Sequence, residues 1–211
     1  MRILFSCTSG DGHLHPMLPL AHALRSAGHE VAFAMAAEYG SRLKAAGFTF
    51  FAAGIGGEEL NRRTFEPHSE LVEFPLELQV FVGRFALGDA PDRVDDLRGV
   101  FDGWRPDLVV SEPCDLAAPV VAAAAAIPAV LHSFGRPLPD AHYEAAMPSV
   151  DPLWRTAGVE PAPLCGVYGP VYIDICPPGL GGEAITEMTK VLRLRPTAPQ
   201  DPREAPAWLS A

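Results

Sequence analysis

The opening of the chain, residues 1–35, constrains the fold most strongly. A short apolar strand, Arg2–Cys7, runs into a glycine turn at residues 9–12 and then into an apolar-periodic stretch, Leu14–Ala27, which Gly28 closes. This order is typical of a doubly wound α/β sheet, whose ligand crevice lies outside the carboxyl ends of the strands. His13 falls at that crevice, and histidine is the side chain whose unperturbed pKa lies closest to neutrality. His13 is therefore a candidate general base.

The rest of the chain alternates β-like and helical runs. Six apolar runs that end in turn signals predict strands, at Arg2–Cys7, Glu30–Met35, Phe48–Ala52, Asp107–Ser111, Pro128–His132 and Val171–Cys176. Helical periodicity predicts helices at Leu14–Ala27, Ala37–Ala46, Pro91–Trp104, Leu116–Ala126 and Asp140–Ala157. Such alternation predicts a Rossmann-like, doubly wound parallel sheet, with its first five strands in the order 3-2-1-4-5.

The connection between the third and fourth strands, residues 53–106, is much longer than an ordinary crossover. Its residues 58–69 are polar and predict a loop. An aromatic stripe with Phe74, Phe81 and Phe85 follows, and then the helix Pro91–Trp104. The sequence therefore predicts a helical insertion between strands three and four. Its aromatic stripe fits core packing, and it also fits the wall of a substrate pocket.

Length and proline content suggest the domain organisation. A chain of 211 residues can bury a sizeable core. Residues 1–195 are expected to form one domain. Residues 196–211 hold four prolines among many polar residues, and they predict a linker or tail.

Charge and cysteine usage exclude several functional classes. A net charge of -10 argues against binding nucleic acid, because no basic stripe is available to neutralise phosphates. The four cysteines form no CxxC pair and no Cys/His ligand spacing, which predicts free thiols and no metal site. The sequence contains no signal peptide and no apolar run of the roughly 20 residues that a membrane span needs. A cytoplasmic protein is expected.

Two ionisable residues follow strands that should be neighbours. His13 follows the first strand and Glu112 the fourth, so both should face the crevice at the switch point. A glutamate on one imidazole nitrogen fixes the tautomer and leaves the other nitrogen free to take a proton. General-base help of this kind is worth about 10²–10⁴-fold in rate. The alternative is that His13 is a turn residue and that Glu112 only caps the next helix.

A dinucleotide-binding function finds little support. Gly10 and Gly12 fit the GxGxxG pattern, but His15 occupies the third glycine position. The second strand ends at Met35 rather than at an acidic residue that could bind a ribose. No phosphate-binding loop or serine elbow occurs. An NAD(P)-type Rossmann enzyme therefore remains only as an alternative.

Several spaced motifs together resemble one family. They are GHLHPMLPL at residues 12–20, LRSAGHEV at 24–31, PDLVVSEP at 106–113, IPAV at 127–130 and PAWL at 206–209. In this order they resemble the N-terminal, acceptor-binding domain of GT-B fold glycosyltransferases. The most similar group is the bacterial natural-product enzymes related to the UDP-glucuronosyltransferase family.

The resemblance implies a reaction and a set of site residues. It implies inverting transfer of a sugar from a UDP- or dTDP-linked donor to a hydroxyl of a hydrophobic small molecule, without a cofactor or metal. His13 would be the general base and Glu112 its assistant, and Asp11 and Gly12 would form the donor-side turn. The residues expected in the acceptor pocket are Phe74, Phe81, His132, Phe134 and Met147.

The resemblance also implies an incomplete cleft. Members of the family carry the nucleotide-sugar site largely in a second domain, and no donor motif follows Trp208. The chain is therefore expected to bind acceptor and to need a C-terminal donor domain or a companion chain for turnover; self-association stays open. The alternative is a non-catalytic ligand- or partner-binding module that has kept the fold.

Overall fold

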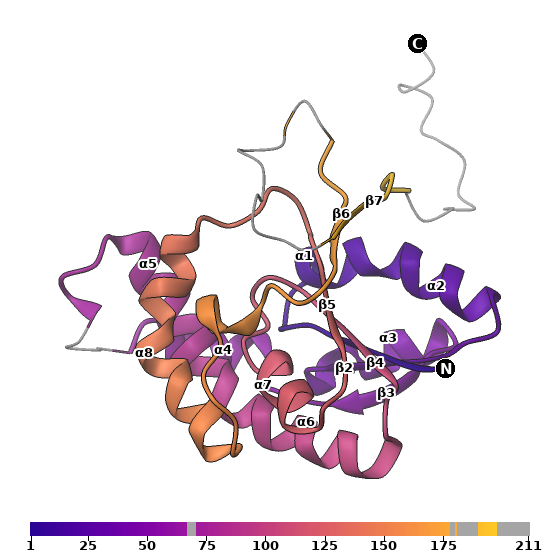
Figure 1. Cartoon of the computed structure of the whole chain (residues 1–211), viewed down its shortest axis with the longest axis horizontal. Helices are drawn as coiled ribbons and strands as arrows, with labels where there is room; N and C mark the ends of the chain where they lie inside the picture. Colours follow the sequence, from indigo (N-terminus) through magenta and orange to yellow (C-terminus); the bar gives the residue numbers. More distant parts are fainter. Residues whose placement is uncertain (67–70, 178–179, 181–189, 198–211) are drawn as a thin grey trace.

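A computed structural model describes residues 1–66, 71–177, 180 and 190–197 of the chain. These residues form one parallel sheet of seven strands in the order β3-β2-β1-β4-β5-β6-β7 (Figure 1). The strands are β1 Arg2–Ser6, β2 Glu30–Met35, β3 Thr49–Ala52, β4 Leu108–Ser111, β5 Ala129–His132, β6 Tyr172–Asp174 and β7 Val191–Arg193. The predicted order of the first five strands is confirmed, and β1 and β4 lie side by side at the centre.

Helices cover both faces of the sheet because successive strand residues point to opposite sides. Ile3 and Phe5 of β1 pack into one apolar cluster with residues of the first helices, whereas Leu4 packs into a second cluster. The first face carries α1 Asp11–Leu14, α2 Leu18–Ser26 and α3 Gly40–Ala45. The second carries α6 Ala90–Trp104, α7 Ala118–Ala124 and α8 Asp140–Thr156. The doubly wound architecture is confirmed.

The first helix differs from the predicted Leu14–Ala27. It begins earlier, as α1 at Asp11, and passes through a 3₁₀ turn at His15–Met17 before α2 begins at Leu18. Pro16 lies at the start of that turn and Pro19 at the start of α2. Because proline lacks an N–H donor, it fits the first turn of a helix and interrupts a continuous one. The break places His13 on a separate short turn.

The insertion is helical over more of its length than predicted. Residues 58–64, expected to lie in a polar loop, belong to α4 Gly57–Thr64, so that prediction was wrong there. Glu59 pairs with Arg62 and Arg63 at helical spacing, and Leu60 is buried beneath them. These ion pairs and the burial of Leu60 stabilise a helix that the polar composition of the segment does not indicate. Residues 67–70 of the expected loop lie outside the described residues.

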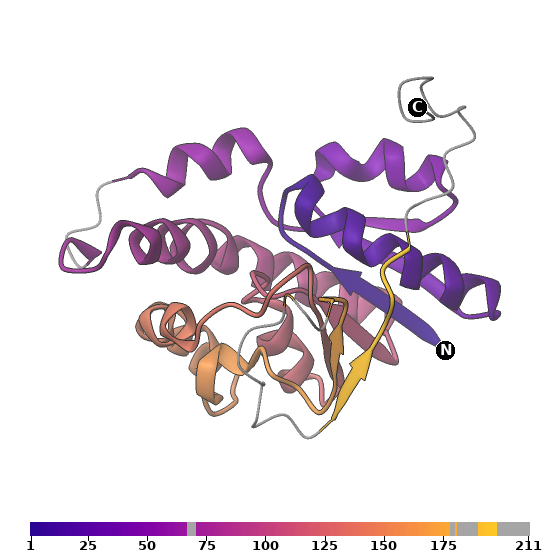
Figure 2. The same cartoon turned by 90° about the horizontal axis from the view of Figure 1, so that it is seen from above.

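The aromatic stripe forms a helix of unusual geometry. After α5 Leu76–Phe81 the chain widens into a π-helix, Val82–Asp89, and continues directly into α6. π-helical turns occur frequently at functional sites. In Figures 1 and 2, α5 lies with α8 on the side of the molecule away from the N-terminus. The π-helix thereby reaches from the tip of the insertion back to the sheet.

The last strands extend the sheet beyond the prediction. The predicted strand Val171–Cys176 is shorter, as β6, and β7 beside it was missed because it has only three residues, all of them exposed. Two further 3₁₀ turns lie at Ala37–Tyr39 and Pro163–Gly166. Residues 198–211 of the expected tail lie outside the described residues. Among the described helices, none has the length and apolar character that a bilayer span requires.

Candidate active site

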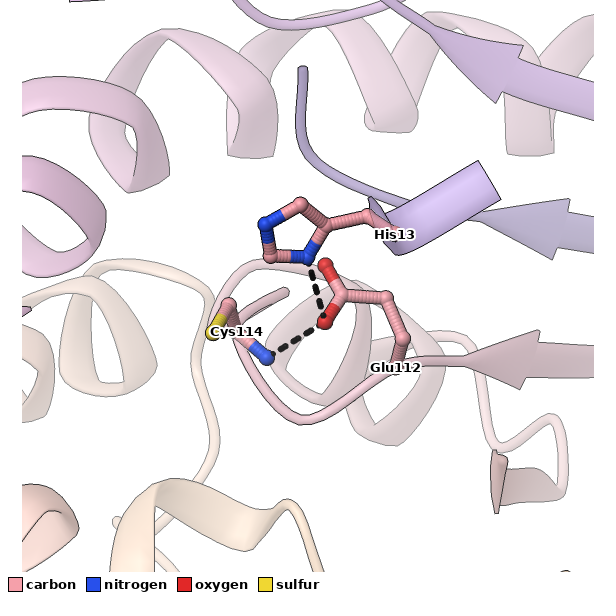
Figure 3. A group of neighbouring side chains, drawn as sticks. All are labelled: His13, Glu112 and Cys114. Atoms are coloured by element: carbon pink, nitrogen blue, oxygen red, sulfur yellow. Dashed lines mark hydrogen bonds and ion pairs between the residues drawn. The ribbon is translucent and has the colours of Figure 1, made fainter. Parts of the chain in front are cut away.

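His13 and Glu112 meet at the carboxyl ends of the central strands. Ser6 of β1 is in register with Ser111 of β4, so the segments that follow them lie next to each other. The Nδ1 atom of His13 lies 3.2 Å from Oε2 of Glu112 (Figure 3). The His13 side chain is 18% exposed and that of Glu112 is fully buried. Only the imidazole is thus open to a ligand.

Other residues hold the Glu112 carboxylate in place. Thr8 donates its backbone N–H and its hydroxyl to Oε1, at 3.2 and 3.0 Å. The backbone N–H of Cys114 donates to Oε2 at 2.7 Å. Glu112 therefore bonds both within its own loop and to the segment that follows β1. Asp115 instead caps α7 through the N–H groups of Ala117 and Ala118. The residue that caps the next helix, α7, is therefore Asp115 and not Glu112.

The two groups of the pair shift each other's pKa values. Burial disfavours the charged form of Glu112, but His13 and the N–H donors outweigh it and hold its pKa below the ordinary value. Burial likewise disfavours charged His13, yet the nearby Glu112 carboxylate raises the pKa of His13 above its ordinary 6.5. The Nδ1–Oε2 contact is too poorly aligned for a good hydrogen bond, and Nδ1 has no other partner among the described residues. The contact acts mainly as an ion pair.

Close neighbours fix the His13 ring from three sides. A Cβ atom at Gly10 would lie 2.7 Å from Cδ2 of His13, so a side chain at residue 10 would collide with the ring. Phe134 meets the ring edge-on with centroids 5.2 Å apart, and Phe85 of the π-helix does so at 5.8 Å. Apart from the Glu112 carboxylate, the ring is thus flanked by aromatic side chains.

A buried arginine ties the strand ends together beneath the pair. Arg93 of α6 is 1% exposed. It donates to the backbone oxygens of Cys7, Ala34 and Ala53 at 2.6, 2.8 and 2.9 Å. Cys7 and Ala53 directly follow β1 and β3, and Ala34 lies near the end of β2. Its Nε lies 3.1 Å from Oδ2 of Asp115. The insertion is thus anchored to the sheet directly under the candidate site.

Asp89, at the end of the π-helix, completes this buried cluster. Burial raises the pKa of Asp89 to about 6, although the Arg93 guanidinium 3.9 Å away opposes the rise. Its Oδ1 accepts the N–H of Ile55, and its buried Oδ2 has no hydrogen-bond partner among the described residues. The charged form of Asp89 is therefore poorly stabilised at the point where the insertion joins the sheet.

The residues expected in the acceptor pocket lie at different distances from His13. Phe134 contacts the ring. Phe81 is buried and packs against Phe85 and Tyr143, one layer farther away, while Phe74 and Met147 are partly buried against the same cluster.

The expected pocket residue His132 is enclosed rather than open. It is 1% exposed, its Nδ1 lies 2.7 Å from the Ser133 oxygen, and burial lowers its pKa. Its position argues for a structural role at the end of β5. The sequence indicated Phe85 only as a member of the aromatic stripe. It did not indicate Thr8 or Cys114, because neither belongs to a motif and both contact Glu112 only once the chain is folded.

The expected donor-side turn is exposed. Asp11 pairs with Arg42 at 2.6 Å, and this hydrogen bond lowers the pKa of Asp11. A Cβ atom at Gly12 would meet nothing within 4 Å. The turn therefore offers free space beside the candidate base.

The fold and the site define a class of protein: the N-terminal half of a GT-B glycosyltransferase. Residues 22–196 match the family described as erythromycin biosynthesis protein CIII-like, N-terminal domain, and the chain belongs to this family. The match begins after His13, so the assignment of that residue rests on the geometry above.

Similar proteins match most or all of the chain. The L-demethylnoviosyl transferase of Streptomyces niveus is 30% identical over 100% of this chain and 53% of its own length. The elloramycin glycosyltransferase of Streptomyces olivaceus is 30% identical over 77% of this chain and 44% of its own length. The structure of the Streptomyces sp. SF2575 glycosyltransferase SsfS6 matches with a TM-score of 0.73 and 26% identity, over 99% of this chain and 58% of that one.

The chain thus spans about half the length of the curated relatives it matches. The relatives and neighbours named above are all glycosyltransferases, several of them from antibiotic biosynthesis, which favours a transferase over a nicotinamide enzyme.

Proposed function

We propose that this chain is the acceptor-binding half of an inverting glycosyltransferase that modifies hydrophobic natural products. The observation that carries the proposal is the His13–Glu112 pair, in which a partly exposed imidazole turns Nδ1 toward a buried carboxylate. Its other nitrogen, Nε2, has no hydrogen-bond partner among the described residues and stays available to a substrate.

The pair suits deprotonation of an acceptor hydroxyl. Nε2 takes the hydroxyl proton while the acceptor oxygen attacks the anomeric carbon of the sugar, and the nucleoside diphosphate leaves from the opposite face. The Glu112 carboxylate stabilises the imidazolium that forms. Thr8 and Cys114 hold that carboxylate through their backbone N–H groups and keep it within reach of His13.

The surroundings of His13 favour an apolar, ring-containing acceptor. Phe134 and Phe85 flank the imidazole, and aromatic faces pack well against flat or apolar molecules. A spinosyn rhamnosyltransferase of similar fold, with a TM-score of 0.74 and 25% identity, has a solved structure with spinosyn aglycone. SsfS6 has been solved with thymidine diphosphate, which supports a dTDP-linked donor.

The donor site is expected largely outside this chain. Asp11 and Gly12 supply only an exposed turn next to His13, with room for a diphosphate. We therefore expect the chain to need a second, donor-binding half and to transfer little sugar by itself. We expect this reaction to take place in the cytoplasm.

Calorimetry with the untagged chain tests the proposal. We expect measurable binding of an aglycone such as tylactone or spinosyn aglycone and little or no binding of a dTDP-sugar. Phe134→Ala should weaken aglycone binding about tenfold, since it removes a partly buried aromatic side chain next to His13. The control Phe65→Ala, at a position 75% exposed, should change nothing. Tight donor binding without aglycone binding would overturn the assignment.

A further inference from the structure

A third side chain of metal-ligand type lies beside the His13–Glu112 pair. Cys114 follows Glu112 by two residues, and its N–H bond to the carboxylate folds the loop back so that its thiol lies near the imidazole (Figure 3). One ligand atom each from His13, Glu112 and Cys114 lie within 4.8 Å of one another. The linear spacing of these residues carries no metal-binding signature; the fold alone brings them together.

The spacing within the pair suits a zinc ion. Zinc binds histidine nitrogen and carboxylate oxygen at about 2.0–2.2 Å in tetrahedral geometry, so two such ligands lie roughly 3.3 Å apart. The observed separation of Nδ1 and Oε2 is 3.2 Å. A zinc–sulfur bond of about 2.3 Å would require the Cys114 sulfur to approach by roughly 1 Å, which rotation of its side chain can supply.

The chemistry of the three groups suits a transition metal such as zinc. Nδ1 of His13 is buried and makes no well-aligned hydrogen bond to any of the described residues, so it has a lone pair or proton to satisfy. A thiolate and a carboxylate together balance the two charges of the ion, which a buried site requires. Nitrogen and sulfur ligands exclude magnesium and calcium, which prefer oxygen.

We propose that Nδ1 of His13, the Glu112 carboxylate and the Cys114 thiolate bind one Zn²⁺ ion, and that this ion switches off the candidate base. The thiol releases its proton to solvent as the Zn–S bond forms, and water from the exposed side of His13 fills the fourth position. With Nδ1 on the metal, neutral imidazole carries its proton on Nε2. That nitrogen then has no lone pair with which to accept the proton of an acceptor. The inhibitory part rests on the proposed function, whereas the binding part does not.

The binding test uses the untagged, metal-free 211-residue chain titrated with ZnCl₂ by calorimetry. Co²⁺ serves as a spectroscopic probe, because a Co–thiolate bond gives a charge-transfer band. We expect one Zn²⁺ per chain and a thiolate band with Co²⁺. His13→Ala and Cys114→Ser should each weaken Zn²⁺ binding more than about 100-fold. Loss of a residue that only hydrogen-bonds to a metal ligand already lowers metal affinity about 10- to 100-fold.

Matched controls separate this site from other histidines and thiols. His15→Ala removes a histidine that is 55% exposed, and Cys165→Ser removes a buried thiol that donates a hydrogen bond to the Tyr143 carbonyl oxygen. Both should bind Zn²⁺ like the original chain, and thermal unfolding checks that every variant is folded. Equal binding by Cys114→Ser and Cys165→Ser, or no stoichiometric binding by the original chain, would overturn the metal site.

Activity separates the two proposals. With a donor-binding half from a relative supplied as a fusion, Zn²⁺ should abolish sugar transfer by the original chain and a chelator should restore it. Transfer that Zn²⁺ leaves unchanged, although the ion binds, would refute the inhibition. Stoichiometric Zn²⁺ binding without any transfer would leave the metal site standing and count against the proposed function.

Discussion

Replacing Glu112 by glutamine should reverse the direction in which the pKa of His13 is shifted. Glu112→Gln keeps the shape and the hydrogen-bonding reach of the side chain but removes its charge. At a separation of 3.2 Å, the attraction between the two charges is about 5 kcal/mol for an effective dielectric constant near 20. Burial of the imidazole opposes that attraction and remains in the variant. We therefore expect the pKa of His13 to fall from above 6.5 to below it.

The assay is an NMR titration of the histidine-labelled chain, with and without the substitution. Glu30→Gln, at the opposite end of the sheet strands, is the matched control and should leave His13 unchanged. A His13 pKa that stays put or rises in Glu112→Gln would refute the ion-pair reasoning.

Linkage extends the same prediction to stability. The raised pKa of His13 means that its contribution is complete below 6.5 and is lost as the pH rises through the folded-state pKa. The lowered pKa of Glu112 means that its contribution is present above 4.5 and is lost as the pH falls through the folded-state pKa. The difference in free energy of unfolding between the original chain and Glu112→Gln should therefore be largest from pH 4.5 to 6.5. A difference that is flat with pH would contradict the assignment.

Three further substitutions test the surroundings of the pair. Gly10→Ala should displace the His13 ring and change its NMR shifts and pKa, whereas Gly12→Ala, which meets open space, should not. Arg93→Met leaves buried carboxylates unpaired and should cost about 3–5 kcal/mol in urea unfolding, against less than about 0.5 kcal/mol for Arg98→Met at the surface; equal losses would refute the role of the buried cluster. Because the pKa of Asp89 is raised from 3.8 to about 6, its ionisation should destabilise the fold progressively as the pH rises from 3.8 to about 6, with no further change at higher pH. Asp89→Asn should remove that component of the pH dependence, and an unchanged profile would contradict the burial argument.

The sequence predicts the sheet well because its signals there are local. Apolar runs that end in turns mark the central strands, and the order 3-2-1-4-5 follows from doubly wound topology. That topology alone predicts that His13 and Glu112 face the same crevice, and the structure brings them within 3.2 Å.

Signals fail where structure depends on distant contacts. The sequence of α4 looks like a polar loop because most of its residues are charged or polar and Leu60 is its one large apolar residue. The helix is stabilised by ion pairs such as Arg63–Glu59, which the composition does not reveal. Phe85 faces His13 because a π-helix changes the spacing of the aromatic stripe, which a regular helical pattern does not anticipate. The roles of Arg93 and Cys114 arise from contacts with several strand ends and loops. No motif marks either residue.

The rate of sugar transfer by a His13→Ala variant tests the central claim most directly. The chain is joined to the donor-binding half of a relative and assayed with a dTDP-sugar and an aglycone that calorimetry has shown to bind. We predict that His13→Ala lowers kcat by about 10²–10⁴-fold while aglycone affinity changes little, because the substitution removes the base rather than the pocket. An unchanged kcat in His13→Ala would show that this imidazole is not the base.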